Sequence, residues 1–336
     1  MNHFECTGTH KQIGFAMGSA LWEHKTQLLQ QVPFAITRER IEYAAACVPV
    51  YQAYYPEILE ELEGLASGQR CDVSMLQAVL FSTYAIPPAC YCSCFAAASD
   101  REVMFGRNSD FLTALEASNT NVIYRPTDGA YSFTGNTTSF LQMEDGVNEY
   151  GLAVGLTSVY PAVRKPGFNA GLLTRYFLEK CRTVPEALAA LERLPVGSAQ
   201  TLTLADPAGN MAVAECCAEK TEVILPAGRE RPFVCATNAF HSAAMQQYLV
   251  PQEDDWFAEP RYQTMRKALE GPAELPLRLF AEKLLSGGCG LLCQYDRSTG
   301  RDTVWSVIYD LGQRRVYRSE GNPARAGYRQ DTRFSF

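Results

Sequence analysis

Residues 90–111 read CYCSCFAAASDREVMFGRNSDF, and this stretch decides how the rest of the sequence is interpreted. Two apolar runs flank the polar segment Ser99-Asp-Arg-Glu, a pattern that predicts a β-hairpin. If the turn is centred near Asp100, residues that pair across it have numbers that sum to about 200, so Cys92 lies opposite the region from Arg107 to Asp110. We therefore expect the hairpin to bring a thiol, a guanidinium and a carboxylate together.

This grouping suits nucleophilic catalysis, because a cation beside a thiol raises the thiolate fraction and a carboxylate can hold a nearby amine. Two kinds of base are open. A papain-type arrangement would recruit one of the four histidines, His3, His10, His24 or His241. If Cys92 instead became an N-terminus, its own α-amino group, with an ordinary pKa of about 8, could take the thiol proton. The competing structural interpretation is a core cysteine beside a buried ion pair.

The cysteines of this stretch allow a third, non-enzymatic interpretation. Cys90, Cys92 and Cys94 alternate along the predicted strand and therefore lie on one face of it. Three thiols on one face are compatible with a metal-binding or redox module. A structural zinc site normally needs a second ligand cluster, and Cys216-Cys217 does not have that spacing.

The composition narrows the class of protein and its partners. The chain has 336 residues, of which 47% are hydrophobic, and a net charge of -7, so it is neither disordered nor fibrous. The acidic excess leaves no basic stripe, which argues against a nucleic-acid partner. No apolar run approaches the roughly 18 residues of a membrane span, and the N-terminus lacks a signal-peptide core. We expect a cytoplasmic protein with no membrane partner, in which most cysteines are reduced.

Outside the hairpin, helical and strand-like periodicities alternate along the chain. Helical spacing runs from about residue 25 to residue 86, where Pro87-Pro88 stops it. The strand-like runs that follow predict a consecutive antiparallel sheet; they lie at residues 95–98, 103–105, 121–124, 131–133, 140–143 and 152–156. Later segments predict helices at 172–194 and 260–285, a second sheet beginning with strands at 200–205 and 211–216, and a closing hairpin at 303–319. The pattern indicates an α+β fold with sheets covered by helices in layers.

The central stretch resembles the N-terminal-nucleophile hydrolases of the choloylglycine hydrolase and acyl-coenzyme A:6-aminopenicillanic acid acyltransferase group, which includes peptidase family C45. Their shared pattern stands here as Cys92-Ser93-Cys94-Phe95 and Gly106-Arg107-Asn108-Ser109-Asp110-Phe111, and only this register selects Cys92 among the three cysteines. Further similarities extend through the chain, at Asn148–Leu156, Leu204–Gly209 with Glu215, Ala236–Asn238, Pro260–Tyr262 and Thr303–Asp310. Gly8–Gly14 and Glu61–Ala66 resemble the acyltransferase branch, whose members carry a helical leader before the nucleophile.

The resemblance implies a fold and a maturation step. The fold would be a four-layer αββα sandwich of two antiparallel sheets, with a helical leader at residues 1–91 and the hydrolase domain at 92–336. The Cys92 thiol would cut the bond between Tyr91 and Cys92, and the two resulting chains would stay associated. Tyr91 stands where the penicillin acyltransferase has glycine, so we expect its bulk to slow this self-cleavage.

The resemblance also implies roles for individual residues. Cys92 would be the nucleophile and, through its α-amine, the base, while Arg107 and Asp110 would position the thiol and the amine. Asn238 would donate to the oxyanion, and Arg261 would support the cluster from a greater distance. The second oxyanion donor is not assigned, because Thr157-Ser158 stand where the bile-salt branch has asparagine.

The activity implied is hydrolysis of a linear, non-peptide amide bond, or transfer of its acyl group to an amine. The substrate would be a small-molecule amide or acyl thioester; neither a metal nor an organic cofactor would be needed, and a homo-oligomer is allowed. The alternative enzyme is an uncleaved cysteine hydrolase that uses His241, three residues after Asn238. Several aromatic residues either fill the core or line an apolar acyl pocket: Tyr84, Tyr91, Phe111, Tyr160, Phe168 and Phe240.

Overall fold

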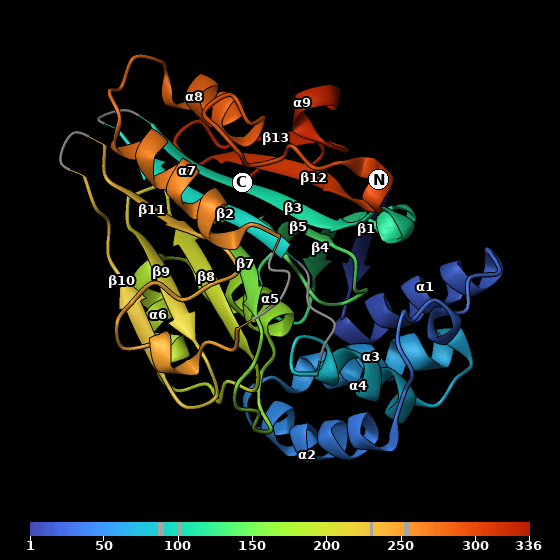
Figure 1. Cartoon of the computed structure of the whole chain (residues 1–336). Helices are drawn as coiled ribbons and strands as arrows, with labels where there is room; N and C mark the ends of the chain where they lie inside the picture. Colours follow the sequence, from blue (N-terminus) through green and yellow to red (C-terminus); the bar gives the residue numbers. More distant parts are fainter. Residues whose placement is uncertain (87–90, 100–101, 229–230, 252–255) are drawn as a thin grey trace.

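Two β-sheets stacked face to face organise the chain (Figure 1). The structure is a computed structural model that describes residues 1–86, 91–99, 102–228, 231–251 and 256–336. The first sheet has the order β1 (Asn2–Gly8), β4 (Thr120–Pro126), β5 (Phe133–Thr137), β6 (Asp145–Asn148), β7 (Ala153–Val159), β8 (Ala199–Ala205), β9 (Met211–Cys216), β10 (Thr221–Ile224). The second has the order β11 (Phe233–Ala236), β2 (Tyr91–Ala98), β3 (Val103–Leu112), β12 (Arg301–Asp310), β13 (Arg315–Ser319), β14 (Arg329–Asp331).

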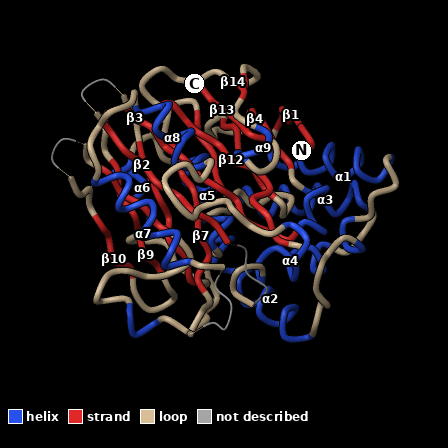
Figure 2. Tube along the Cα trace, turned by 45° about the horizontal axis from the view of Figure 1, so that its top comes forward, coloured by secondary structure: helices blue, strands red, loops and turns tan. Residues whose placement is uncertain are grey.

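Helices cover the outer face of each sheet (Figures 1 and 2). The first sheet is covered by α5 (Ala170–Lys180) and α6 (Val184–Leu191), and the second by α7 (Ala258–Glu270) and α8 (Leu277–Leu285). The N-terminal helices pack at the β1–β4 end of the first sheet; they are α1 (His10–Glu23), α2 (Arg38–Tyr54), α3 (Pro56–Gln69) and α4 (Val73–Ser82). The short helix α9 spans Pro323–Ala326, and 3-10 helices occur at Leu28–Gln30 (η1), Thr113–Ser118 (η2), Gln246–Tyr248 (η3) and Arg297–Thr299 (η4).

Alternation along β2 explains the layering. Cys94 and Ala96 face the other sheet, in an apolar cluster with residues of β7 and β9. Phe95 and Ala97 point the other way, into a cluster with α7 and α8. The strand is thus buried on both faces and reads as a nearly continuous apolar run. The expected α+β fold, a four-layer αββα sandwich, is confirmed.

The arrangement of strands differs from the expectation in three respects. The predicted consecutive sheet is split, because β2 and β3 belong to one sheet and β4 to β7 to the other. Strands β8 and β9 extend the first sheet beyond β7 and do not begin a second one. Residues 140–143 form a turn in which Phe140 has a φ of 54°, and the strand follows at β6. Local periodicity locates most of the strands but does not determine which sheet they join.

The leader also differs from an all-helical segment. Helices α2, α3 and α4 lie within the predicted helical region, but α1 precedes it, and residues 2–8 form strand β1. This strand pairs with β4 in parallel, so the eight-stranded sheet is not purely antiparallel. Helices α1 and α3 approach closely at glycines: a Cβ on Gly14 would lie 2.0 Å from the Glu61 carbonyl oxygen, and one on Gly64 2.1 Å from that of Lys11. Strand β1 thus joins the leader to the eight-stranded sheet by backbone pairing. The glycines allow α1 and α3 of the leader to pack closely against each other.

Candidate active site

The hairpin of β2 and β3 has the register that the sequence predicts. Cys92 pairs with Ser109, Cys94 with Arg107, and Tyr91 with Asp110. Cys92 and Arg107 thus lie two residues out of direct opposition on neighbouring strands, within reach of a long side chain. All of these residues except Tyr91 are buried.

A guanidinium holds the Cys92 thiol. The Nη2 of Arg107 donates to the Cys92 Sγ at 2.7 Å, and both side chains are fully buried. Arg107 Nη1 donates to the Asp145 carboxylate at 2.9 Å, and Nη2 also lies 3.2 Å from the Glu144 carboxylate. Burial by itself would lower the pKa of Arg107, but the thiol and the two carboxylates hold that pKa well above its ordinary value. The guanidinium is therefore a fixed cation next to the sulfur.

The two carboxylates that face Arg107 are fixed in turn by other side chains. Asp145 accepts hydrogen bonds from the Trp305 indole at 3.1 Å and the Tyr309 hydroxyl at 2.7 Å. Glu144 accepts from the Ser109 hydroxyl at 3.2 Å and the Thr138 hydroxyl at 2.6 Å. No motif in the sequence identifies Glu144 or Asp145 as partners of Arg107. The available signal was an acidic pair at the start of the buried strand β6, where uncompensated carboxylates would be costly.

Side chains also hold the backbone of Cys92. Its N–H donates to the Asn238 Oδ1 at 2.8 Å, and its carbonyl oxygen accepts from Arg261 Nη1 at 2.6 Å. Strand β11 ends at Ala236, which pairs with Cys94. Beyond that end of β11, the side chains of Asn238 and Arg261 bond to the backbone N–H and carbonyl oxygen of Cys92. The thiol, amide and carbonyl of Cys92 therefore each have a defined partner.

Arg261 connects the parts of this cluster. It donates through Nη1 to the Ser93 hydroxyl at 2.9 Å and through Nη2 to the Asn238 Oδ1 at 3.0 Å. It also forms a buried ion pair with Asp110 at 3.4 Å. The family resemblance implies that Arg261 supports the cluster from a greater distance, whereas the Arg261 side chain contacts Cys92 directly. The interaction joins residues 169 positions apart, which no local pattern indicates.

Asp110 lies behind Arg261, surrounded by donors. The Thr303 hydroxyl donates to Asp110 Oδ1 at 2.6 Å and the Tyr295 hydroxyl to Oδ2 at 3.0 Å. Burial raises the pKa of Asp110, and the Arg261 guanidinium and these hydrogen bonds oppose that rise. Asp110 therefore fixes Arg261, which contacts Cys92.

Thr157 and Ser158 hold the segment that carries Asn238. The Thr157 hydroxyl donates to the Thr237 carbonyl oxygen at 2.6 Å, and the Asn238 Nδ2 donates to the Ser158 carbonyl oxygen at 2.8 Å. Because Oδ1 accepts from both Cys92 and Arg261, the orientation of the Asn238 amide is set by its partners.

The residue before Cys92 is fixed by an aromatic contact. The Tyr91 ring stacks on Trp256 with 4.7 Å between ring centroids and 10° between ring planes. The Trp256 carbonyl oxygen in turn accepts from Arg261 Nε at 2.9 Å. Arg261 is thus linked to both sides of the bond between Tyr91 and Cys92: it donates to the Cys92 carbonyl oxygen and to the carbonyl oxygen of Trp256, on which Tyr91 stacks.

The residues of the two alternative interpretations lie as follows. The His241 ring interacts with Glu259 at 3.1 Å and stacks on Tyr262 with 3.5 Å between centroids. Cys90 lies outside the described residues, and Cys92 Sγ faces a guanidinium. Within the part of the chain that the structure describes, no group of three or more His, Cys, Asp or Glu residues is placed to hold a metal ion.

None of the described helices combines the length and apolar character needed to cross a membrane.

Comparisons with known proteins identify a family. The family model described as "Acyl-coenzyme A:6-aminopenicillanic acid acyl-transferase" matches residues 97–325, more than half of the chain. The matched range begins after Cys92 and includes Arg107, Asp110, Asn238 and Arg261. No curated protein sequence matches the chain.

Several solved structures are similar at low identity. Penicillin V acylase from Agrobacterium tumefaciens has 17% identity and a TM-score of 0.44, over 68% of this chain and 83% of that one. A mutant of conjugated bile acid hydrolase from Clostridium perfringens has 15% identity and a TM-score of 0.47, over 68% and 89%. The Caenorhabditis elegans ortholog of N-acylethanolamine-hydrolyzing acid amidase has 17% identity and a TM-score of 0.47, over 66% and 93%.

Proposed function

The chain belongs to the acyl-coenzyme A:6-aminopenicillanic acid acyl-transferase family, and on this premise we propose that it is a self-processing cysteine amidohydrolase or acyltransferase. It cleaves linear, non-peptide carbon–nitrogen bonds through an acyl-enzyme on Cys92. The substrate is a small-molecule amide or acyl thioester, and the reaction uses the chain's own side chains and its new N-terminus.

Maturation begins with attack of the Cys92 thiol on the Tyr91 carbonyl carbon. The bond from that carbon to the Cys92 nitrogen breaks, the nitrogen takes the thiol proton, and a thioester to the Cys92 sulfur forms. Water then hydrolyses the thioester, which leaves a carboxylate on Tyr91 and a free thiol and α-amine on Cys92. The stacking of Tyr91 on Trp256 and the hydrogen bond from Arg261 to the Cys92 carbonyl oxygen support this step, because they hold both sides of the bond.

Turnover uses the groups that surround the new N-terminus. The α-amine takes the thiol proton, Arg107 stabilises the thiolate, and the sulfur attacks the substrate carbonyl. The Asn238 oxygen, which accepts the Cys92 N–H at 2.8 Å, orients the amine, and the Asn238 amide is the candidate donor to the oxyanion. The leaving amine takes the proton from the α-amine, and water or a second amine then accepts the acyl group.

One observation carries this proposal: the thiol, the N–H and the carbonyl of Cys92 contact Arg107, Asn238 and Arg261 respectively, all within 2.8 Å. A core cysteine in a strand would bond its backbone to neighbouring strands and leave its sulfur in apolar contacts. Here polar side chains take both roles. The alternative base, His241, has its ring against Glu259 and Tyr262, which favours the α-amine as base.

The leader would remain part of the mature protein after cleavage. Strand β1 pairs with β4 along its whole length, from Asn2 with Thr120 to Gly8 with Pro126. The buried His10 of α1 is held by Asp128 at 2.8 Å and by Glu179 of α5 at 3.0 Å. Cutting one peptide bond at residue 91 breaks none of these contacts, so residues 1–91 and 92–336 would stay associated.

The test is the intact mass of purified protein under denaturing conditions, measured for wild type and for Cys92→Ala. We expect two species that meet between Tyr91 and Cys92 in wild type, and one uncut, inactive species in Cys92→Ala. Cys94→Ala is the matched control, because Cys94 is a buried thiol on the same strand, and it should be cut and active. Cleavage of Cys92→Ala at the same bond contradicts the mechanism. An uncut wild-type protein whose amidase activity is lost in His241→Ala would establish the histidine alternative.

A further inference from the structure

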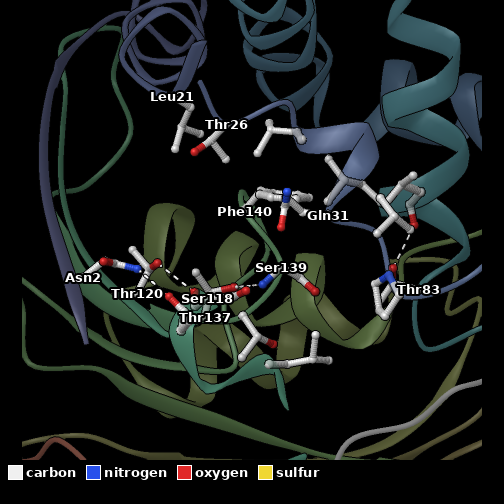
Figure 3. Close-up of a pocket in the computed structure, with 18 of the residues that line it drawn as sticks. Asn2, Leu21, Thr26, Gln31, Thr83, Ser118, Thr120, Thr137, Ser139 and Phe140 are labelled. Carbon is white, nitrogen blue, oxygen red and sulfur yellow. Dashed lines mark hydrogen bonds between the residues drawn. The ribbon is translucent and has the colours of Figure 1, made fainter. Parts of the chain in front are cut away.

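A cavity of about 550 Å³ lies between the leader and the eight-stranded sheet (Figure 3). Leu21 and Thr26 face Thr137 and Ser139 across it, while Phe140 and Gln31 project between the two walls. Leader segments α1, η1 and α4 form one wall, and β4, β5 and η2 form the other. The volume falls within the range of roughly 300–1,000 Å³ that is typical of small-molecule sites.

The lining is largely apolar. Its apolar residues include Met17, Leu28, Val122 and Phe140, and its polar groups are mostly hydroxyls, such as those of Thr137 and Ser139. Among the described residues that line the cavity there is no Asp, Glu, Lys or Arg, and the histidine in its lining, His24, is exposed. A charged ligand group would therefore lose its hydration without gaining a carboxylate, ammonium or guanidinium partner, whereas an uncharged apolar group would gain from burial.

The cavity is connected to the Cys92 site through neighbouring residues, since none of the described residues that line it is Cys92 or a direct partner of Cys92. Arg107 and Asp110 belong to the site, and the next residue, Phe111, lines the cavity. A second connection runs through Thr138, a lining residue whose hydroxyl donates to Glu144, the carboxylate that faces Arg107. Cys92 also shares one apolar cluster with the lining residues Leu80 and Val122. Tyr84 and Phe111, two of the six aromatic residues singled out in the sequence, line the cavity, whereas Phe168 and Phe240 are buried in the core.

We infer that this cavity binds the acyl part of the substrate, and that this part is an uncharged, apolar acyl chain. The inference rests on the proposed function, since it assigns the acyl side of the bond that Cys92 attacks. The leader then supplies one wall of the acyl site and is a substrate-binding element as well as the segment removed from Cys92. The leaving amine lies outside the cavity.

The kinetic test uses N-acyl p-nitroanilides with straight acyl chains from acetyl to tetradecanoyl. In wild type, kcat/KM should rise by about fourfold per added methylene, the equivalent of about 0.8 kcal/mol, until the cavity is filled. Ser139→Trp and Leu21→Trp, which fill the cavity from opposite walls, should remove this rise, so that kcat/KM no longer increases with the length of the acyl chain. Ala114→Trp is the control, because Ala114 is exposed on η2 and does not line the cavity.

A binding test without turnover separates the two proposals. Octanamide should bind Cys92→Ala in titration calorimetry, acetamide and the charged octanoate should bind more weakly, and Ser139→Trp in the same background should abolish octanamide binding. If octanamide binds in this way but no protein hydrolyses amides, the cavity assignment stands and the Cys92 proposal fails. If wild type hydrolyses amides at a rate independent of chain length, and Ser139→Trp changes neither hydrolysis nor binding, the cavity assignment is wrong while the proposed function holds.

Discussion

Replacing His10 by glutamine should remove a pH-dependent contribution to the docking of the leader. His10 is fully buried; its Nδ1 lies 2.8 Å from Asp128 and its Nε2 lies 3.0 Å from Glu179. Glu179 is also paired with Arg175 at 2.8 Å. The leader residue His10 thus meets carboxylates of the body on both sides of its ring. Glutamine retains a hydrogen-bond donor but carries no charge.

The magnitude follows from the pKa of His10. Burial opposes the charged form, but the hydrogen bond and the charge of Glu179 outweigh it and raise the pKa from 6.5 to about 9. Because the folded pKa is raised, the contribution to the free energy of unfolding is complete below pH 6.5 and is lost as the pH rises through about 9. A rise of this size corresponds to about 3 kcal/mol. At the acid end, burial alone would raise the pKa of Glu179, but Arg175 and His10 lower it from 4.5 to about 2, so its contribution is lost as the pH falls through that range.

The assay is urea unfolding at pH 6 and at pH 9.5, in a Cys92→Ala background that keeps the chain in one piece. The free energy of unfolding should fall by about 3 kcal/mol more between these pH values in the parent than in the His10→Gln variant. His24→Gln is the matched control, since His24 is an exposed histidine at the end of the same helix, and it should follow the parent. Equal pH dependence in the parent and in His10→Gln would refute the reasoning.

Three further predictions concern the helix contact and the Cys92 site. Gly64→Ala should cost about 1–3 kcal/mol in urea unfolding, because its Cβ would lie 2.1 Å from the Lys11 carbonyl oxygen; Gly271→Ala, whose nearest neighbour would be at 3.3 Å, is the control. Arg107→Lys should lower kcat/KM by about 100-fold or more and slow alkylation of Cys92 at fixed pH, since an ammonium cannot hold the thiol and both carboxylates at once; wild-type alkylation kinetics would argue against a guanidinium-held thiolate. Asn238→Ala should lower kcat/KM by about 10²- to 10³-fold without weakening octanamide binding in the Cys92→Ala background, and a loss below tenfold would remove Asn238 from the mechanism.

Some of the site could be predicted because it is local. The hairpin of β2 and β3 depends on two apolar runs and one polar turn, so alternation and chain reversal suffice to place Cys92 near Arg107 and Asp110. The closing hairpin of β12 and β13 is predictable for the same reason. The partners of Arg107 and the central position of Arg261 were not predictable, since they join strand and helix residues that only the packed layers bring into contact.

The sequence by itself determined the α+β class and the strand pair that places Cys92 near Arg107. These features follow from periodicity and turn chemistry over a few residues. Only the tertiary structure decided that β1 joins β4 in parallel, that the strands after β3 move to the other sheet, and that a cavity opens between leader and sheet. The physical reason is that the pairing of distant segments depends on the apolar surface that each segment buries against the rest of the chain. The local sequence pattern of a strand is compatible with several such partners, so it does not select one of them.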